Sequence, residues 1–353
     1  MSLPRFLRSF SWICVFVSSL FLFSRISIHA APPQHSSYHI IRKAVLGGDG
    51  GWDYLTVDSE ARRIYISRGT HVIVVDENSL KQIGDIPNTK GVHGIALAKD
   101  LGKGFISDGG ANSVTEFEIA TLKTVATIDV SGQNPDSILY DPQSKRVFTF
   151  NGRSSNATAI DAETGKVVGT IALPGKPETP VLDGKGKIFV NIEDKNSLTE
   201  LDAKTLAVEH TYAMEGCEGP SGIAMDTKTR RIFSGCSDSK VMAVTDADTG
   251  KQVARPPIGE DVDADRFDPA TKLAFASCRE GVLSIIHEDS PDKYSVAGNV
   301  KTEFGARTMG LDTKTHHVFV VTSDLKPGTA SADNPHPRPV PVPGTFRIIE
   351  LGE

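Results

Sequence analysis

Side chains able to bind a ligand or a cation recur along this 353-residue chain at intervals of about 42 residues. Four are carboxylates, and the others are an imidazole, a hydroxyl and a guanidinium. The set is Asp53, His93, Asp136, Glu178, Ser221, Asp263 and Arg307. Each precedes a short apolar segment by the same offset, so a repeating fold would bring all seven to one place. We therefore predict one polar site built from seven parts of the chain.

Hard carboxylate oxygens suit Ca²⁺ or Mg²⁺, and His93 extends the range to transition metals. Asp261 and Asp265 add negative charge beside Asp263. The alternative is that these acids accept hydrogen bonds from turn amides, as Asp and Ser commonly do. The spacing is not that of a known metal motif, so a metal and its ligands stay unassigned, and a divalent cation is one candidate cofactor.

The elements that position these residues form a sevenfold repeat. Each copy has an apolar strand ending near an acid, a turn, an aromatic-containing strand, a third strand and a fourth. The acids are Asp58, Asp100, Asp141, Asp183, Asp226, Asp268 and Asp312, and the aromatics are Tyr65, Phe105, Phe148, Phe189, Phe233, Phe275 and Phe319. Four antiparallel strands in roughly 40–45 residues are typical of a propeller blade. We predict an all-β, seven-bladed β-propeller over residues 31–353, with the aromatics between blades and the seven polar residues at the channel mouth.

Ring closure follows from the two ends of the repeat. The last copy has its third strand within residues 344–351 and no fourth strand after it. A strand-like segment, residues 38–46, precedes the first copy. We expect that segment to be the outer strand of the last blade. Between the second and third strands of that blade, the proline-rich segment Asp324–Gly344 is either a disordered insertion or an ordered polyproline flap over the mouth.

The first 30 residues differ from the rest. Arg5 and Arg8 precede a 12-residue apolar run, residues 12–23, and small residues follow at Ala30 and Ala31. This is the pattern of a secretory signal peptide, and the alternative is an uncleaved anchor. We predict a periplasmic or secreted monomer with no transmembrane segment after cleavage. Residues 1–30 carry three Arg and no acid, so the net charge falls from −6 to −9 on their removal. Such a surface repels nucleic acid.

Three cysteines follow the signal segment: Cys217, Cys236 and Cys278. In an oxidising compartment one disulfide and one free thiol are expected. Cys217 and Cys236 bracket two strands of the fifth copy, and Cys236 and Cys278 occupy equivalent places in adjacent copies. Sequence position leaves both pairings open.

The repeat resembles the YVTN-repeat, or YncE-like, family of seven-bladed β-propellers. The likeness to exported bacterial members is carried by residues 216–226, 231–236, 287–293 and 305–309. It implies a periplasmic propeller, mostly without an assigned reaction, and it implies a Cys217–Cys236 disulfide. The Gly-His and Trp-Asp signatures of WD-type repeats do not recur in the copies.

No catalytic motif stands out, so no catalytic residue is assigned and an enzyme is the less favoured interpretation. The first hypothesis is a binding or scaffold module for a small molecule or protein at the channel face. The second is a lactonase-like hydrolase that uses a divalent cation. The third, by analogy alone, is an accessory protein of a periplasmic dehydrogenase system.

Overall fold

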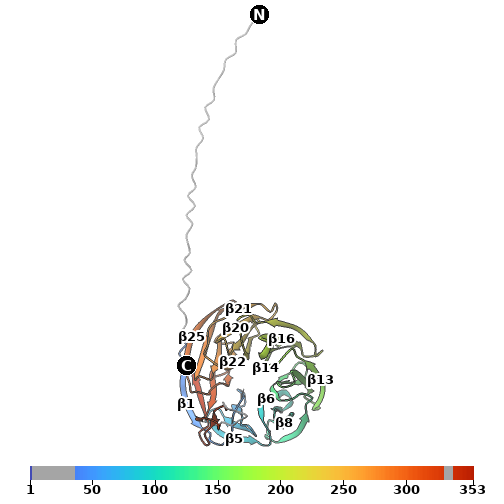
Figure 1. The fold of residues 1–353 in the computed structure, drawn as a ribbon, viewed down its shortest axis with the longest axis vertical. Helices are drawn as coiled ribbons and strands as arrows, with labels where there is room; N and C mark the ends of the chain where they lie inside the picture. Colours follow the sequence, from blue (N-terminus) through green and yellow to red (C-terminus); the bar gives the residue numbers. More distant parts are fainter. Residues whose placement is uncertain (2–35, 330–336) are drawn as a thin grey trace. The chain divides into compact units, whose positions relative to one another are not determined.

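The computed structural model describes the chain except residues 2–35 and 330–336, and all that follows concerns the compact unit Pro33–Glu353. The predicted signal peptide lies outside the described residues. Seven four-stranded antiparallel sheets form a ring of blades, with β6 and β14 near its centre and β13 and β25 at its rim (Figure 1). The predicted seven-bladed propeller is confirmed.

The strands follow one another outward in each of the first six blades. Blades 1 to 3 contain β2 (Leu55–Asp58), β3 (Arg63–Ser67), β4 (Val72–Asp76), β5 (Lys81–Ile86); β6 (Val92–Ala98), β7 (Lys103–Asp108), β8 (Ser113–Glu118), β9 (Thr124–Asp129); and β10 (Pro135–Asp141), β11 (Arg146–Asn151), β12 (Asn156–Asp161), β13 (Lys166–Ala172). Blades 4 to 6 contain β14 (Pro177–Leu182), β15 (Lys187–Ile192), β16 (Ser197–Asp202), β17 (Val208–Ala213); β18 (Pro220–Asp226), β19 (Arg231–Cys236), β20 (Val241–Asp246), β21 (Gln252–Ala254); and β22 (Val262–Asp268), β23 (Leu273–Cys278), β24 (Val282–Ser290), β25 (Lys293–Lys301). Two short 3₁₀ turns, η1 (Lys99–Leu101) and η2 (Glu193–Lys195), lie in blades 2 and 4.

Blade 7 joins the two ends of the chain. Its strands run β26 (Met309–Asp312), β27 (His317–Thr322), β30 (Arg347–Gly352) and β1 (His39–Val45), from the channel outward. β1 pairs antiparallel with β30 from His39–Gly352 to Val45–Arg347. The N-terminal strand therefore closes the ring, as predicted, and no blade is left with an unpaired third strand.

The hydrophobic core lies between blades. The seven predicted aromatics are all completely buried. Phe148 of blade 3, for example, belongs to one cluster with Ile188 and Val190 of blade 4. Alternating side chains on a strand point to opposite faces of its sheet, so each blade has two apolar faces and needs two neighbours to cover them. Closure of the ring satisfies that need for every blade.

Buried acids fix the turn after most first strands. The carboxylate of Asp183 accepts hydrogen bonds from the backbone amides of Lys185 and Lys187 at 2.7 and 2.9 Å. Equivalent bonds are accepted by Asp58, Asp141, Asp226, Asp268 and Asp312. Blade 2 differs, because β6 ends at Ala98 and the 3₁₀ turn η1 replaces the Asp turn. Asp100, the acid that marks this repeat in the sequence, is instead a solvent-facing partner of Lys145.

The proline-rich segment Asp324–Gly344 leaves blade 7 between β27 and β30, and its described ends are paired. β28 (Leu325–Lys326) and β29 (Val340–Pro341) form a two-stranded ribbon. These ends line a cavity of about 190 Å³ together with Trp52, Phe304 and Arg307. The base of the segment thus lies beside the channel mouth, while residues 330–336 are outside the described part, so the flap stays a prediction.

Cys217 and Cys236 form a disulfide, as the family resemblance implies, and Cys278 is a buried free thiol. Burial raises the pKa of the Cys278 thiol to about 12, so the group is protonated at neutral pH. Within the described residues, no helix is both long enough and apolar enough to span a bilayer.

Replacing both Cys217 and Cys236 by Ser is expected to lower the free energy of unfolding by about 3 kcal/mol, because the bond closes a loop over a sequence separation of 19 in the unfolded chain. Urea denaturation monitored by circular dichroism measures the loss. Cys278→Ala is the matched control and should cost clearly less. A double variant as stable as the parent would contradict the prediction.

Candidate functional site

A β-bulge positions most of the seven predicted side chains at the channel mouth. In blades 2 to 6 the first strand shifts its register against the second strand just where the predicted residue lies. In blade 3, for example, the shift falls between Pro135 and Ile138 and so includes Asp136. A bulge leaves a residue outside the ladder and redirects its side chain. These five residues are therefore inside their strands, whereas Asp53 and Arg307 precede β2 and β26.

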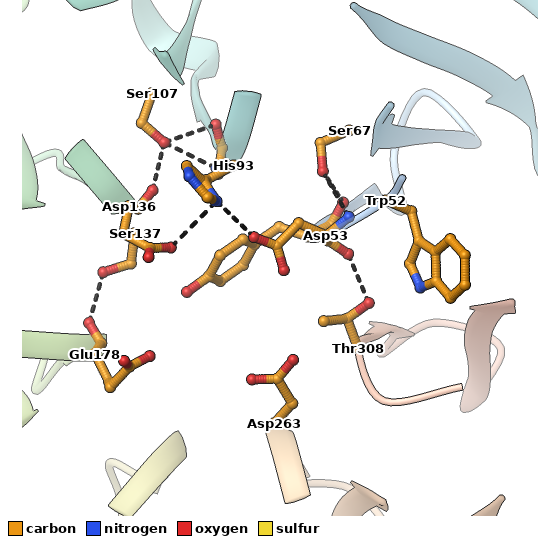
Figure 2. Close-up of polar contacts among 12 residues, drawn as sticks. Trp52, Asp53, Ser67, His93, Ser107, Asp136, Ser137, Glu178, Asp263 and Thr308 are labelled. Carbon is orange, nitrogen blue, oxygen red and sulfur yellow. Dashed lines mark hydrogen bonds and ion pairs between the residues drawn. The ribbon is translucent and has the colours of Figure 1, made fainter. Parts of the chain in front are cut away.

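His93 connects two acids from neighbouring blades (Figure 2). Its Nδ1 lies 2.7 Å from Oδ2 of Asp53 and 3.6 Å from Oδ1 of Asp136. One ligand atom from each of the three residues lies within 4.8 Å of the others, an arrangement that could hold a metal ion. Without a cation, the doubly protonated imidazolium of His93, whose pKa is raised to about 9, provides the positive charge between the two carboxylates.

Arg307 makes the second connection, on the other side of Asp53. Its Nε lies 2.5 Å from Oδ2 of Asp263, and its Nη2 lies 3.3 Å from Oδ1 of Asp53. The hydroxyl of Ser221 lies 3.2 Å from Oδ1 and 3.5 Å from the backbone oxygen of Asp263, so these two acceptors share its one proton. A chain of polar contacts thus runs from Ser221 in blade 5, through Asp263, Arg307 and Asp53, to His93 in blade 2.

Glu178 is the seventh member and depends on a residue that the sequence analysis did not identify. Its Oε1 lies 2.6 Å from Nζ of Lys176, which precedes it in the same blade, and its side chain is 13% exposed. Lys176 also pairs with Glu193. Blade 4 is the one blade with a Lys two residues before its mouth residue. This departure from the repeat could have indicated from the sequence that Lys176 belongs to the site.

A ring of side chain-to-backbone hydrogen bonds holds the mouth together, and sequence reasoning missed it. At six of the seven junctions, a hydroxyl or amide donates to the backbone carbonyl of the mouth residue in the next blade. The donors are Thr308 to Asp53, Ser107 to Asp136, Ser137 to Glu178, Asn191 to Ser221, Ser221 to Asp263 and Ser277 to Arg307. At the remaining junction Thr56 donates to Ile95 at 2.7 Å. Several of these donors are shown in Figure 2.

The charges of the mouth shift its titrations strongly. Burial alone lowers the pKa of His93, but the hydrogen bond to Asp53 and the charges of Asp136 and Glu178 overcome it and raise the pKa to about 9. Burial raises the pKa of Asp136 to about 6 despite the opposing charge of His93. Burial and the charge of Asp136 raise the pKa of Glu178 to about 8 despite Lys176. The mouth therefore holds more protons at neutral pH than the same groups hold in water.

Stability is expected to fall as pH rises above about 6. In each case the folded pKa lies above the unfolded one, so the folded state binds more protons. The His93 contribution is fully present below its ordinary pKa of 6.5 and is lost through about 9, and the Glu178 contribution is lost through about 8. Melting temperatures across this range check the slope. His93→Gln should flatten its upper part, and a parent protein equally stable across the range would contradict the assignment.

A second compartment lies further along the channel, beyond the mouth residues. It is a cavity of about 320 Å³ lined by the first strands of blades 1 to 6, and its polar groups include Tyr54, Thr179 and Arg266. Tyr54 of blade 1 and Thr179 of blade 4 both line this cavity, from blades that are three places apart. Burial and the charges of Asp136, Asp53 and Glu178 raise the pKa of Tyr54 well above its ordinary value.

Comparison with known proteins supports the fold and leaves the family open. No protein-family profile matches the chain. A curated relative, Antigen Lp49 from Leptospira interrogans serogroup Icterohaemorrhagiae serovar copenhageni (strain Fiocruz L1-130), is 25% identical over 247 residues, which is 63% of this chain. The chain spans about half (52%) of that protein's length.

Two solved structures share the architecture. Hydrazine synthase from Kuenenia stuttgartiensis superposes with a TM-score of 0.69 at 15% identity, over 80% of this chain and 95% of that one. The WD40 repeats of RRP9 superpose with a TM-score of 0.72 at 9% identity, over 90% and 99% of the two chains. At these identities the likeness concerns the fold alone.

Proposed function

We propose that this propeller is a binding module whose channel mouth recognises a cationic group, such as an ammonium, on a small molecule or protein. The observation that carries the proposal is the charge balance of the mouth. Asp53 and Asp263 share Arg307, and Asp53 also contacts His93. Among the described residues, the one cationic partner of Asp136 is His93 at 3.6 Å, and Glu178 shares Lys176 with Glu193. A second cation between Asp136 and Glu178 would stabilise both carboxylates.

The raised pKa values of Asp136 and Glu178 support this choice of ligand. Desolvated carboxylates that lack enough positive neighbours hold their protons, and a bound ammonium would release them. Binding should therefore strengthen as pH rises through about 8, where Glu178 ionises. The mouth residues are also held by strands around one axis, and side chains on rigid strands position a ligand more precisely than side chains on loops.

Calorimetric titration with butylammonium, and with a tripeptide that has a central lysine, tests the proposal. Both probes should bind the parent protein, and binding should weaken about tenfold in Glu178→Gln and in Asp136→Asn. Asp129→Asn is the matched control, because Asp129 is an exposed acid at the end of β9, on the outer strand of blade 2. Binding that is equally tight in Glu178→Gln, or that weakens as pH rises, would refute the proposal.

A second candidate function is favoured by the geometry around His93. The clustered donor atoms of Asp53, His93 and Asp136 offer two oxygens and one nitrogen, a set that transition-metal ions such as Zn²⁺ and Mn²⁺ accept. These residues would hold the cation, and a cation there could polarise the carbonyl of a substrate, as a lactonase-like hydrolase requires. The metal must displace the imidazole proton, so its affinity should rise with pH.

Native mass spectrometry after incubation with Zn²⁺, Mn²⁺ or Ca²⁺ separates the two candidates. A stoichiometric cation that is lost in Asp53→Asn and Asp136→Asn, and kept in Asp129→Asn, would support the hydrolase. A protein that takes up none of these cations and remains folded in a chelator would support the binding module alone.

We also propose that the chain is an exported, periplasmic or secreted member of the YVTN-repeat family. The support is its sevenfold repeat, the disulfide and the signal-like N-terminal sequence. Disulfides persist in oxidising compartments outside the cytoplasm. Expression with residues 1–30 fused to a reporter, followed by cell fractionation, tests the location, and retention of the reporter in the cytoplasm would contradict it.

A further inference from the structure

Arg266 breaks the repeat at a position that the other blades keep uncharged. In each blade we compare the residue that lies three positions after the mouth residue. In blade 6 this residue is Arg266. The other six blades place small or uncharged residues there: Thr56, Ala96, Leu139, Val181, Ala224 and Gly310. A long cationic side chain at this position is half-buried, and removing a charge even partly from water has a cost that a paired anion would offset.

Arg266 faces a chamber that is lined mostly by apolar residues, although close to half of its exposed surface is polar. The chamber is the 320 Å³ cavity described above, and Leu55, Ile95, Ile138, Ile223, Met225 and Phe267 are among its lining residues. Pockets for small molecules have this composition, with mostly apolar walls and a few polar groups that fix orientation. The volume is at the lower end of the usual range of about 300–1,000 Å³ for such pockets.

No carboxylate among the described residues pairs with the Arg266 guanidinium. Its Nη1 donates a hydrogen bond to the backbone oxygen of the preceding residue, Asp265, at 2.7 Å. The carboxyl group of Asp265 is directed instead at the backbone of Gly235, where an added Cβ would meet Oδ2 at 2.6 Å. Burial lowers the pKa of Arg266, and it raises the pKa of Asp265 to about 7. The guanidinium is thus half-buried at the chamber wall, and it forms no ion pair within the described residues.

The acids of the mouth do not serve as its counter-ions. The mouth acids Asp53 and Asp263 form ion pairs with Arg307, and within the described residues neither forms one with Arg266. Four hydroxyl residues also line the chamber: Tyr54, Thr56, Ser137 and Thr179. Thr56 and Ser137 already donate their protons to the backbone oxygens of Ile95 and Glu178, so the hydroxyls of Tyr54 and Thr179 accompany the guanidinium.

We propose that this chamber binds a small organic acid, with its carboxylate on Arg266 and its apolar body against the aliphatic walls. The planar guanidinium fork matches a carboxylate with two parallel hydrogen bonds. A single arginine with two hydroxyl groups offers too few donors for a phosphate dianion, and the walls favour a hydrocarbon body. The site is separate from the cation site proposed at the mouth, because it uses neither Glu178 nor Asp136.

Isothermal titration calorimetry with benzoate and isovalerate, each compared with its neutral amide, tests the proposal. The acids should bind, and benzamide and isovaleramide should bind at least about tenfold more weakly, because they offer no charge to the guanidinium. Arg266→Gln should lose at least about tenfold in affinity for benzoate and should discriminate little between acid and amide.

Three controls make the outcomes distinct. Arg153→Gln removes an exposed arginine and should leave benzoate binding unchanged. Glu178→Gln should weaken butylammonium but not benzoate, so failure at the mouth and failure in the chamber are separable. The amide comparison in the parent protein remains decisive even if Arg266→Gln does not fold. Equal binding of acid and amide, unchanged benzoate binding in Arg266→Gln, tighter binding of inorganic phosphate than of benzoate, or no binding of either acid would each overturn the proposal.

Discussion

A chain that lacks residues 36–48 should lose cooperative unfolding or melt far below the parent protein. The deletion removes β1, which pairs with β30 at six positions, and it uncovers the edge of β30. It also removes Tyr38, which is buried with residues of blades 6 and 7. Each hydrogen bond between β1 and β30 contributes about 1 kcal/mol. Together with the lost burial of Tyr38, these bonds account for most of a typical folding free energy of about 5–15 kcal/mol.

The controls for this deletion come from the strand itself. Ile41 and Val45 are exposed on β1, so Ile41→Thr with Val45→Thr keeps the pairing and should change stability little. A synthetic peptide of residues 36–48 added to the shortened chain should restore part of the melting temperature. Differential scanning calorimetry measures both effects. A shortened chain that melts at the parent temperature would show that β1 does not close the ring.

Arg307→Met should cost about 3 kcal/mol of unfolding free energy, because it leaves Asp53 and Asp263 without their shared cation. All three side chains are between 19% and 29% exposed, so water offsets only part of the loss. Arg307→Lys should recover part of the stability, since one ammonium can reach one carboxylate but does not reproduce the fork. Guanidinium denaturation is the appropriate measurement.

A double-mutant cycle shows whether the loss arises from the ion pair. Asp263→Asn alone removes one negative charge and should cost less than Arg307→Met. The double variant should be more stable than the sum of the two single changes predicts, by about 1–3 kcal/mol. Strict additivity would mean that Arg307 contributes through packing, and that the contacts with Asp53 and Asp263 do not stabilise the fold.

The architecture was predictable because residues at equivalent positions of the repeat have the same structural role in nearly every blade. Phe189 and Phe233 are buried between blades, and Asp183 and Asp226 cap the same turn, so counting copies gave the number of blades and the register of each. The exception is instructive. Asp100 looks like a turn acid in the sequence, but η1 ends β6 two residues earlier.

The site was predictable only in part, because its contacts depend on features that vary between blades. Equal spacing indicated that His93, Asp136 and Arg307 share one end of the channel. It could not indicate which acid each cation contacts, because that depends on local bulges and on side-chain reach. Arg266 carried a visible signal, a charge at an uncharged position of the repeat, but its meaning required the cavity that it faces.

The pairing of β1 with β30 also dictates the order in which the molecule can be completed. His39 is made among the first of the propeller's residues, and its partner Gly352 is made more than 300 residues later. Until Arg347–Gly352 has been synthesised, β1 has no strand to join and Ile40 has no core to enter. Blades 1 to 6 can pair locally as they emerge, whereas the last blade must wait for the longest-range contact in the fold. A chaperone that holds the N-terminal segment during this interval would therefore cover a strand whose edges are still unpaired.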